Sequence, residues 1–513
     1  MPLPQSNRPW PPPELHKIDR AMREWSAWYE GTPEALSAFY APRQRESVQQ
    51  SERRAGGVLG LLQRMWWGRI PANPSERIDQ AHLPVAADIA RGSADLLYDE
   101  APQITVSESK STQARIDSYM PDVHQVLANG AELGSVLGGR FHRVTWDKTV
   151  ADRPFATTVD ADAAYPEFTW GQLTTVTFWY VVASDETRSK VWRHLERHEL
   201  DADGYGLVFH GLYEGTDSEL GQRRPLNVQA ATAPLSNLVD EFGALKEGRT
   251  KGLNVVYVPN QTPQRRWRHH DPGMFLGRSD LDGVEALMDN LDEAFSSWMR
   301  DIRIGKGRII VPDYMLRSNG PGAGTTFDLD RTVYDSLNIP DTEGSAPPII
   351  AQQFAIRVEE HLATCEKITQ QIVHTAGYSS QTFGDDADGA AVTATEVKAR
   401  ERRTFRTRNR KIRNETPAVR ALVAKMLSID AAVFNTGGLD LTEPISVEFP
   451  DTAEDSPLAM AQTAQALYTA RAASTATLVR MQHPDWTGQQ VQDEVQLIIA
   501  EQRSVVDPFT IGS

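Results

Sequence analysis

With 513 residues, the chain is too long for one ordinary hydrophobic core, so its length predicts three or four structural units. Apolar residues make up 40% and charged residues 24%, a globular balance that excludes wholesale disorder, and the formal net charge of −16 excludes a protein that grips nucleic acid over its whole surface. The single cysteine, Cys365, excludes an internal disulfide framework and a thiolate cluster for zinc.

The first 215 residues predict mixed α and β structure in a protein made in a cytoplasm. No apolar core of a secretory signal opens the chain, and no run reaches the roughly 20 apolar residues of a membrane helix. Apolar residues at helical spacing predict helices over 14–42, and residues 82–106 predict a buried helix that leads into a strand. β-branched and aromatic runs over 174–215, separated by SDETRS and DADGYG, predict an antiparallel meander.

The middle strand of this meander contains HLERH, in which two histidines are four residues apart. A zinc-protease helix needs Glu where Leu195 stands, so the pattern does not fit that metal site. We therefore expect His194 and His198 to be surface or cross-strand residues.

Two amphipathic helices of similar length are predicted in the middle of the chain. The first covers 281–303, where apolar residues recur every three or four positions: Leu281, Val284, Leu287, Leu291, Phe295, Trp298 and Ile302. Its other face carries Glu285, Asp289, Asp292 and Glu293. The second covers 354–376, with Gly377 as its C-cap. Strand and loop residues between the helices predict a long hairpin with a small cap at its tip.

A strongly basic helix follows an acidic loop that contains several glycines. Residues 398–413 hold nine basic side chains against one acid, Glu401. An apolar seam with a spacing of seven is predicted beneath the charges, formed by Phe405, Ile412, Val419 and Met426. Pro417 predicts a kink in this helix or its end, because proline lacks the backbone donor. A strand near 443–449 and an alanine-rich helical tail follow.

No pattern in the sequence predicts catalysis or metal binding. GALKEGRT resembles a phosphate loop, but Arg249 replaces its lysine and no apolar strand precedes it. GDDADGAAVTATE resembles a calcium loop, but Gly384 and Thr395 would occupy its first and twelfth ligand positions. Cys365 lies four residues after His361, yet its place on an apolar helix face predicts a packed core residue. A structural protein is therefore favoured over an enzyme.

Several stretches resemble the portal proteins of tailed bacteriophages, notably those with actinobacterial hosts. They are MREWSAWYEGTPEALSAFY, HLPVAADIARGSADLLYDEAP, VDADAAYPEFTWGQLTTVTFW and LGRSDLDGVEALMDNLDEAFSSWMRDIRIGKGRIIVP. The similarity extends over most of the chain. These stretches are sequence signatures of the family and not catalytic motifs. Only together do they identify the family specifically.

The resemblance implies an α+β portal fold and names its parts. These are an α/β wing (1–280), stem helix 1 (281–303), a small α/β clip (304–353), stem helix 2 (354–378), a tunnel loop (379–393), a kinked tunnel or wing helix (394–428), a return strand to the wing (429–454) and a helical crown (455–513). It also implies a ring of twelve copies at one capsid vertex of the virion. Double-stranded DNA would pass through it, and its partners would be the large terminase, a head-completion or adaptor protein, the major capsid protein and the scaffold. No cofactor, metal or membrane is expected.

The same resemblance suggests roles for the charged residues. The expected channel-lining acids are Glu285, Asp289, Asp292, Asp385, Asp386 and Asp388, and the expected tunnel-loop hinges are Gly384 and Gly389. The basic helix, with Lys398, Arg402, Arg406, Arg410 and Arg413, is expected to face either a neighbouring subunit or DNA. An acidic channel would repel phosphate and so let DNA slide.

Two other classes of function stay open on the sequence. One is a non-catalytic DNA-binding protein that uses the arginine-rich helix 398–413, which predicts salt-sensitive DNA affinity. The other is a packaging enzyme, such as a nuclease or ATPase. The enzyme is disfavoured because the chain lacks a phosphate loop and paired metal carboxylates.

Overall fold

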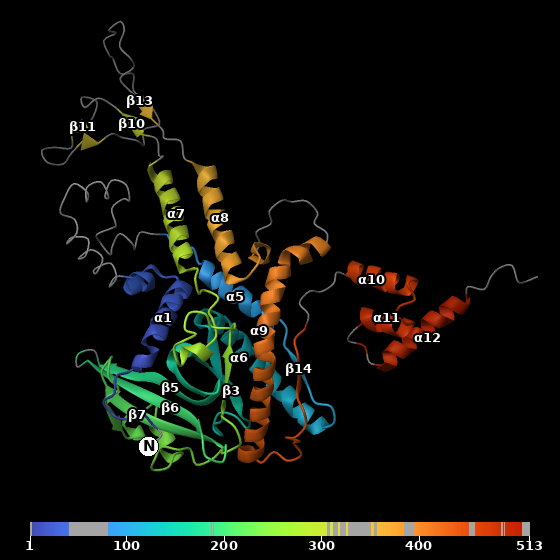
Figure 1. Ribbon diagram of the computed structural model, residues 1–513, viewed down its shortest axis with the longest axis horizontal. Helices are drawn as coiled ribbons and strands as arrows, with labels where there is room; N and C mark the ends of the chain where they lie inside the picture. The colour runs from blue at the N-terminus through green and yellow to red at the C-terminus, as the bar shows by residue number, and fades with distance from the viewer. Residues whose placement is uncertain are drawn as a thin grey trace, which may run out of the picture.

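A computed structural model describes most of the chain (Figure 1). Helices and strands are both abundant, which agrees with the predicted mixture of α and β structure. The described residues are 3–40, 81–185, 187, 189–304, 308–310, 317–318, 325–326, 350–352, 357–383, 394–450, 457–483, 486 and 488–504.

The two largest sheets among the described residues are antiparallel. The five-stranded sheet keeps chain order, as the meander predicts, with strands β4 (Ala164–Thr169), β5 (Gln172–Asp185), β6 (Lys190–Leu200), β7 (Gly206–Gly215) and β8 (Gln222–Arg224). The three-stranded sheet places β2 (Gly139–Thr145) between β3 (Phe155–Asp160) and β9 (Val255–Pro259). Short 3-10 helices connect these parts: η1 (Pro13–Leu15), η2 (Ala161–Ala163), η4 (Leu226–Val228), η5 (Ala233–Asn237) and η6 (Gly273–Phe275).

The main hydrophobic core joins the N-terminal helices, both sheets and the base of a helical hairpin. Helices α1 (His16–Glu30), α5 (Val85–Tyr98) and α6 (Lys110–Leu137) contribute to the packing around the sheets. Fully buried residues from distant segments share this core: Trp25, Ile89, Phe141, Phe178 and Ile372. Each large aliphatic or Phe side chain buried here stabilises the fold by roughly 1.5–3 kcal/mol. The core thereby holds the base of the hairpin in a fixed place.

That hairpin consists of α7 (Glu285–Ile304) and α8 (Val358–Ala376), which extend side by side away from the sheets (Figure 1). Residues 281–284, predicted as helix, form the turn that precedes α7. Gly377 adopts φ +108 and caps α8, as predicted, because glycine tolerates this left-handed backbone. At the far end, β10 (Arg308–Ile310) pairs with β13 (Ile350–Gln352), and β11 (Arg317–Ser318) pairs with β12 (Thr325–Thr326).

The basic helix, α9 (Ala394–Ile429), is the longest helix described, and η8 (Ser380–Phe383) precedes it. It runs through Pro417, so the expectation that the helix ends there is wrong, and a π-helical turn over Asp430–Phe434 continues it. The predicted seam is partly confirmed, because Val419 and Met426 are buried in a second core with helix α6. Packing along this seam holds the helix together across the proline.

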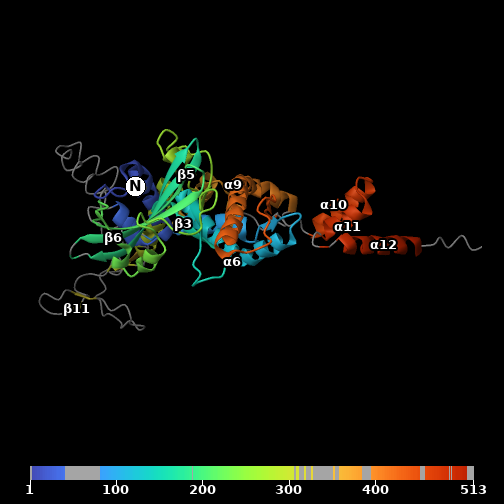
Figure 2. The ribbon, with the colours of Figure 1, turned by 90° about the horizontal axis from the view of Figure 1, so that it is seen from below.

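The C-terminal part returns to the N-terminal region and then forms a separate group of helices. Strand β14 (Ser446–Glu448) pairs with β1 (Gln103–Thr105), which confirms a strand near 443–449. Helices α10 (Pro457–Thr469), α11 (Thr475–Gln482) and α12 (Gly488–Ser504) contact one another in sequence. Figures 1 and 2 both draw this group apart from the sheets.

Candidate functional site

The acidic residues of α7 do not share one environment. Asp292 is buried, and its carboxylate accepts hydrogen bonds from His82 Nδ1 at 2.8 Å and from the Leu83 amide at 3.0 Å. The expectation that Asp292 lines a channel is therefore wrong, because this face of the helix meets the start of the segment that leads into α5.

Glu285 is half-buried, and its side chain also forms hydrogen bonds within the fold. Its carboxylate accepts hydrogen bonds from Trp25 Nε1 at 2.9 Å and from the Gly283 amide at 2.8 Å, and it lies 3.3 Å from the Arg266 guanidinium. Asp289 and Glu293 are exposed. Of the three α7 acids proposed for the channel, Asp289 is the most exposed, but it also borders Tyr40 and His82 of its own chain.

The tunnel-loop residues lie outside the described part of the chain. These are Asp385, Asp386, Asp388, Gly384 and Gly389. Lys398 belongs to the first turns of α9, but its side chain also lies outside the described residues. Their proposed roles stay predictions.

The basic helix divides its charges between two faces. Four arginines three or four residues apart are exposed along one side of the helix. We call them the outer arginine row: Arg402, Arg406, Arg410 and Arg413. Within the described residues, Arg402, Arg406 and Arg413 form no ion pair, and Arg410 only approaches Gln261 Oε1 at 3.5 Å. This row is free to meet a partner or a ligand.

The inward face carries Arg408 and Lys411, which are both buried. Arg408 donates to the Leu96 carbonyl at 2.6 Å and to the Pro450 carbonyl. Lys411 donates to Asp280 Oδ2 at 2.6 Å. These two residues are not among the five basic residues that were expected to face a neighbouring subunit or DNA, and they bind groups of their own chain.

Asp280 is the centre of a buried network that joins four segments. Besides Lys411, its carboxylate accepts from Tyr378 Oη at 2.7 Å, Asn260 Nδ2 at 2.8 Å and Gln261 Nε2 at 2.6 Å. Burial raises the pKa of Tyr378 well above its usual value and lowers the pKa of Lys411, which the nearby Asp280 carboxylate opposes. The network fixes α9 against the end of α8 and the turn before α7.

A second buried ion pair joins α9 to the three-stranded sheet. The guanidinium of Arg140 binds Glu415 through two hydrogen bonds of 2.9 and 2.8 Å, and Tyr98 Oη donates to Glu415 at 2.7 Å. Sequence reasoning missed both networks. Their members are far apart in the chain, so no local spacing signalled them.

A recess lined by hydrogen-bond donors lies between α8 and the start of α9. Its volume is about 610 Å³, and it is called the donor pocket; its lining residues are Lys367, Gln370, Gln371, His374, Tyr378, Ser379, Ser380, Arg402, Arg403 and Arg406. None of these ten is an acid. Arg403 Nη1 lies 2.7 Å from His374 Nε2, which fixes one guanidinium at the rim. Such a lining favours an anionic ligand.

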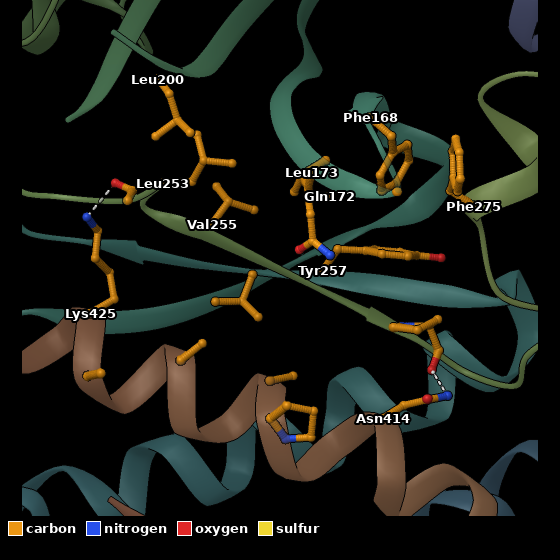
Figure 3. A pocket seen from close by; sticks show the side chains of 18 of the residues that line it. Phe168, Gln172, Leu173, Leu200, Leu253, Val255, Tyr257, Phe275, Asn414 and Lys425 are labelled. Carbon is orange, nitrogen blue, oxygen red and sulfur yellow. Dashed lines mark hydrogen bonds between the residues drawn. The ribbon is translucent and has the colours of Figure 1, made fainter. Parts of the chain in front are cut away.

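A larger, mainly apolar groove of about 740 Å³ runs between α9 and the sheets (Figure 3). Tyr257, Phe168 and Phe275 lie on its sheet side. On the helix side, Lys425 donates to Thr250 Oγ1 at 2.7 Å and to neighbouring carbonyls, and burial lowers its pKa to about 8. With its ammonium already bound to the protein, Lys425 is a structural anchor and not a reactive amine.

The histidines of the meander are cross-strand residues, as expected, but two of them are buried. His194 Nε2 lies 3.1 Å from His210 Nδ1 with the rings stacked, and His198 Nε2 lies 2.7 Å from Glu196. His198 and His210 are buried. Burial lowers the pKa of His210 to about 4. Burial also lowers the pKa of His194, so the rings of His194 and His210 are neutral at physiological pH.

The side chains within the described ranges give no support to a metal site or to a reactive thiol. Cys365 is buried in the main core, and burial raises the pKa of its thiol, which agrees with a packed core cysteine. No group of three or more His, Cys, Asp or Glu among the residues with defined positions is arranged to hold a metal ion. Likewise, none of the helices described has the length and apolar character needed to cross a membrane.

Comparison with known proteins gives a family match over almost the whole chain. The profile of the family described as "Phage portal protein, SPP1 Gp6-like" matches residues 19–507. No curated protein sequence matches the chain. One solved structure with a similar trace is described as "Neck of native GTA particle computed with C12 symmetry"; it is 10% identical, covers 78% of this chain and 90% of that chain, and has a TM-score of 0.37.

Proposed function

Since the chain belongs to the phage portal protein family, SPP1 Gp6-like, we propose that its copies form a closed ring at one capsid vertex and that double-stranded DNA passes through the ring. The family match over residues 19–507 is the observation that carries this proposal. Twelve copies are the expected number. Portal proteins are structural components of the virion, and we expect no catalytic step and no cofactor.

The described hairpin and the overall charge support this role. The hairpin of α7 and α8 extends from a wing whose core holds its base, which suits a stem that carries the clip (Figure 1). Twelve copies at −16 each would carry about −190, and a negative wall repels phosphate over the Debye length. A ring of this charge guides DNA without retaining it.

The remaining partners follow from the same proposal. The clip (304–353) would meet the large terminase during packaging and a head-completion or adaptor protein afterwards. The wing would face the major capsid protein and the scaffold. The tunnel loop (379–393) would lie next to the DNA.

Imaging of the purified protein tests the proposal directly. We expect negative-stain class averages to show an annulus with a central hole and native mass spectrometry to give a multiple of the 57.1 kDa subunit, twelve in the expected case. Compact single subunits at every protein and salt concentration would contradict the ring.

A second candidate is a DNA-binding protein that uses the basic helix 398–413. The outer arginine row favours it, because its side chains are exposed and form no ion pair among the described residues, and neutralising phosphates is the main source of DNA affinity. It predicts tight, salt-sensitive binding of duplex DNA by single subunits, whereas a portal should bind weakly unless it is assembled.

A further inference from the structure

The outward face of α5 carries two acids near the C-terminal end of the helix. Asp95 and Asp99 are exposed and one helical turn apart, and neither forms an ion pair with a described residue. Partial burial and the carboxylates of Asp99 and Glu132 raise the pKa of Asp95, which the Arg91 guanidinium opposes only in part. The negative end of the helix macrodipole also disfavours acids at this position. A cation brought close to Asp95 would relieve both effects.

A cluster of arginines lies on the outward side of α9. Arg278 Nη2 donates to Gln261 Oε1 at 2.7 Å, and Arg410 Nη1 approaches the same oxygen at 3.5 Å. Arg413 is exposed three residues after Arg410. Burial lowers the pKa of Arg278, and nearby guanidiniums, that of Arg410 among them, add to this effect against two carboxylates. A carboxylate or phosphate would pair with these guanidiniums better than a neutral amide oxygen does.

The contact between α5 and α9 puts the two patches on opposite sides of this helix pair (Figure 1). The Lys411 ammonium donates to Ser93 Oγ, so each of these side chains points toward the other helix. Asp95 follows Ser93 by two residues, which is about 200° around α5, and so it lies on the side away from α9. Arg413 follows Lys411 by two residues and lies on the side of α9 away from α5.

The same contact places both patches at a similar height. Lys411 binds Ser93, and Arg408 donates to the Leu96 carbonyl at 2.6 Å, so this part of α5 lies beside residues 408–411 of α9. Rotation about a ring axis keeps every residue at its own height. For an axis that runs along the stem, the acids of one copy therefore face the arginines of the next. Different patches on opposite sides make a head-to-tail contact, and such contacts generate rings when the rotation closes.

We propose that Asp95 and Asp99 of one copy bind Arg410 and Arg413 of the adjacent copy, with Arg278 beside them. This inference rests on the proposed ring and names a contact that closes it. Both pairs span about one helical turn, so two ion pairs form together. DNA phosphates would also bind these arginines, but they would leave the like charges around Asp95 unrelieved. One contact between copies relieves both patches.

A mixing experiment tests this contact. One full-length variant carries Arg410→Glu and Arg413→Glu, and a second carries Asp95→Lys and Asp99→Lys. Each variant alone places like charges in every contact, so we expect its ring fraction to fall more than about tenfold by mass photometry. In an equimolar mixture every contact again pairs opposite charges. Rings should return, and native mass spectrometry should show the two variants in equal numbers within each ring.

Two exposed charges outside the contact provide matched controls. Arg420→Glu changes the same helix as the arginine variant, and Glu241→Lys makes the same kind of change as the acid variant. Both should assemble as the wild type does. Circular dichroism and thermal unfolding of each variant confirm that its subunits are folded.

Each outcome has one meaning. Recovery in the mixture supports the contact, because a patch that pairs with charges of its own copy is not restored by mixing. Rings from either variant alone, or no rings from the mixture while the wild type assembles, overturn this contact and leave the proposed ring intact. If the wild type and both controls stay monomeric, the proposed function itself fails. If the arginine variant forms rings but loses duplex DNA affinity, the arginines bind phosphate and the proposal is wrong.

Discussion

Buried charges at single positions tie the basic helix to the rest of the molecule. Asp280 and Lys411 are 3% or less exposed in their side chains, and Arg140 and Glu415 are similarly buried. Both pairs are surrounded by further hydrogen-bond partners, which is what makes buried charges tolerable. These residues act on stability and on the position of α9, and not on a ligand.

Removing one partner of such a pair should be costly. Lys411→Met leaves the Asp280 carboxylate buried without its cation, so we expect the free energy of unfolding to fall by about 3–5 kcal/mol. Urea unfolding at a fixed protein concentration measures this change. Arg420→Ala, an exposed change on the same helix, should shift the value by less than about 0.5 kcal/mol. An equally small effect of Lys411→Met would show that the pair is not formed.

The buried histidines predict how stability depends on pH. Burial lowers the pKa of His142, His194 and His210 below the value of about 6.5 that histidine has in an unfolded chain. The unfolded state therefore binds more protons than the folded state as pH falls from about 6.5 toward 4. Linkage then requires stability to fall over this window.

The His210→Gln variant isolates one of these groups. Because glutamine does not titrate, we expect the loss of unfolding free energy between pH 6.5 and pH 4 to be smaller than in the wild type. Thermal or urea unfolding across this range measures the slope. His16→Gln, an exposed histidine, should leave the slope unchanged. Equal slopes for the wild type and His210→Gln would contradict the assignment.

At the scale of elements, α9 contains a proline inside the helix, and the packing of neighbouring side chains keeps the helix continuous there. Pro417 is exposed, and the helix continues on both sides of it. Proline inside a helix removes a hydrogen bond and costs roughly 3 kcal/mol. The neighbouring Val419, buried in the second core, helps to offset this cost.

Replacing that proline should therefore stabilise the subunit. We expect Pro417→Ala to raise the free energy of unfolding by about 1–3 kcal/mol, because alanine restores the backbone donor and loses little packing. Differential scanning calorimetry measures the shift in melting temperature. A lower melting temperature of the variant would show instead that the fold needs a kink at Pro417, which is one of the two outcomes predicted from the sequence.

At the scale of the whole molecule, charge decides how the assembled protein treats DNA. The outer arginine row is a local basic patch on a chain with a net charge of −16. If those arginines are covered by neighbouring acids in a ring, the assembled protein has little positive surface left. Weak binding of duplex DNA follows from the proposed assembly.

We expect assembled rings to bind short duplex DNA no more tightly than about 1 µM at physiological salt. Fluorescence anisotropy with a labelled duplex, repeated at several salt concentrations, measures the affinity and its salt dependence. Nanomolar binding by single subunits with a steep salt slope would favour the DNA-binding alternative over the portal.

The local patterns of the sequence were enough to predict the main helices and strands. The β-branched and aromatic runs over 174–215 predicted the meander, helical spacing predicted α7 and α8, and Gly377 predicted the end of α8. These features depend on residues that are close in the chain, where periodicity and capping act. The family resemblance depends on the same local stretches, and the profile match confirms the portal family, while the link to actinobacterial hosts stays a prediction.

The tertiary structure alone decided which charges are buried. Asp289 and Asp292 lie three residues apart on α7, yet Asp289 is exposed and Asp292 binds His82. Arg410 and Lys411 are neighbours, yet the first faces outward and the second reaches Asp280, 131 residues away. Spacing along a helix gives the side on which a residue lies. What covers that side depends on the packing of distant segments, which no local pattern records.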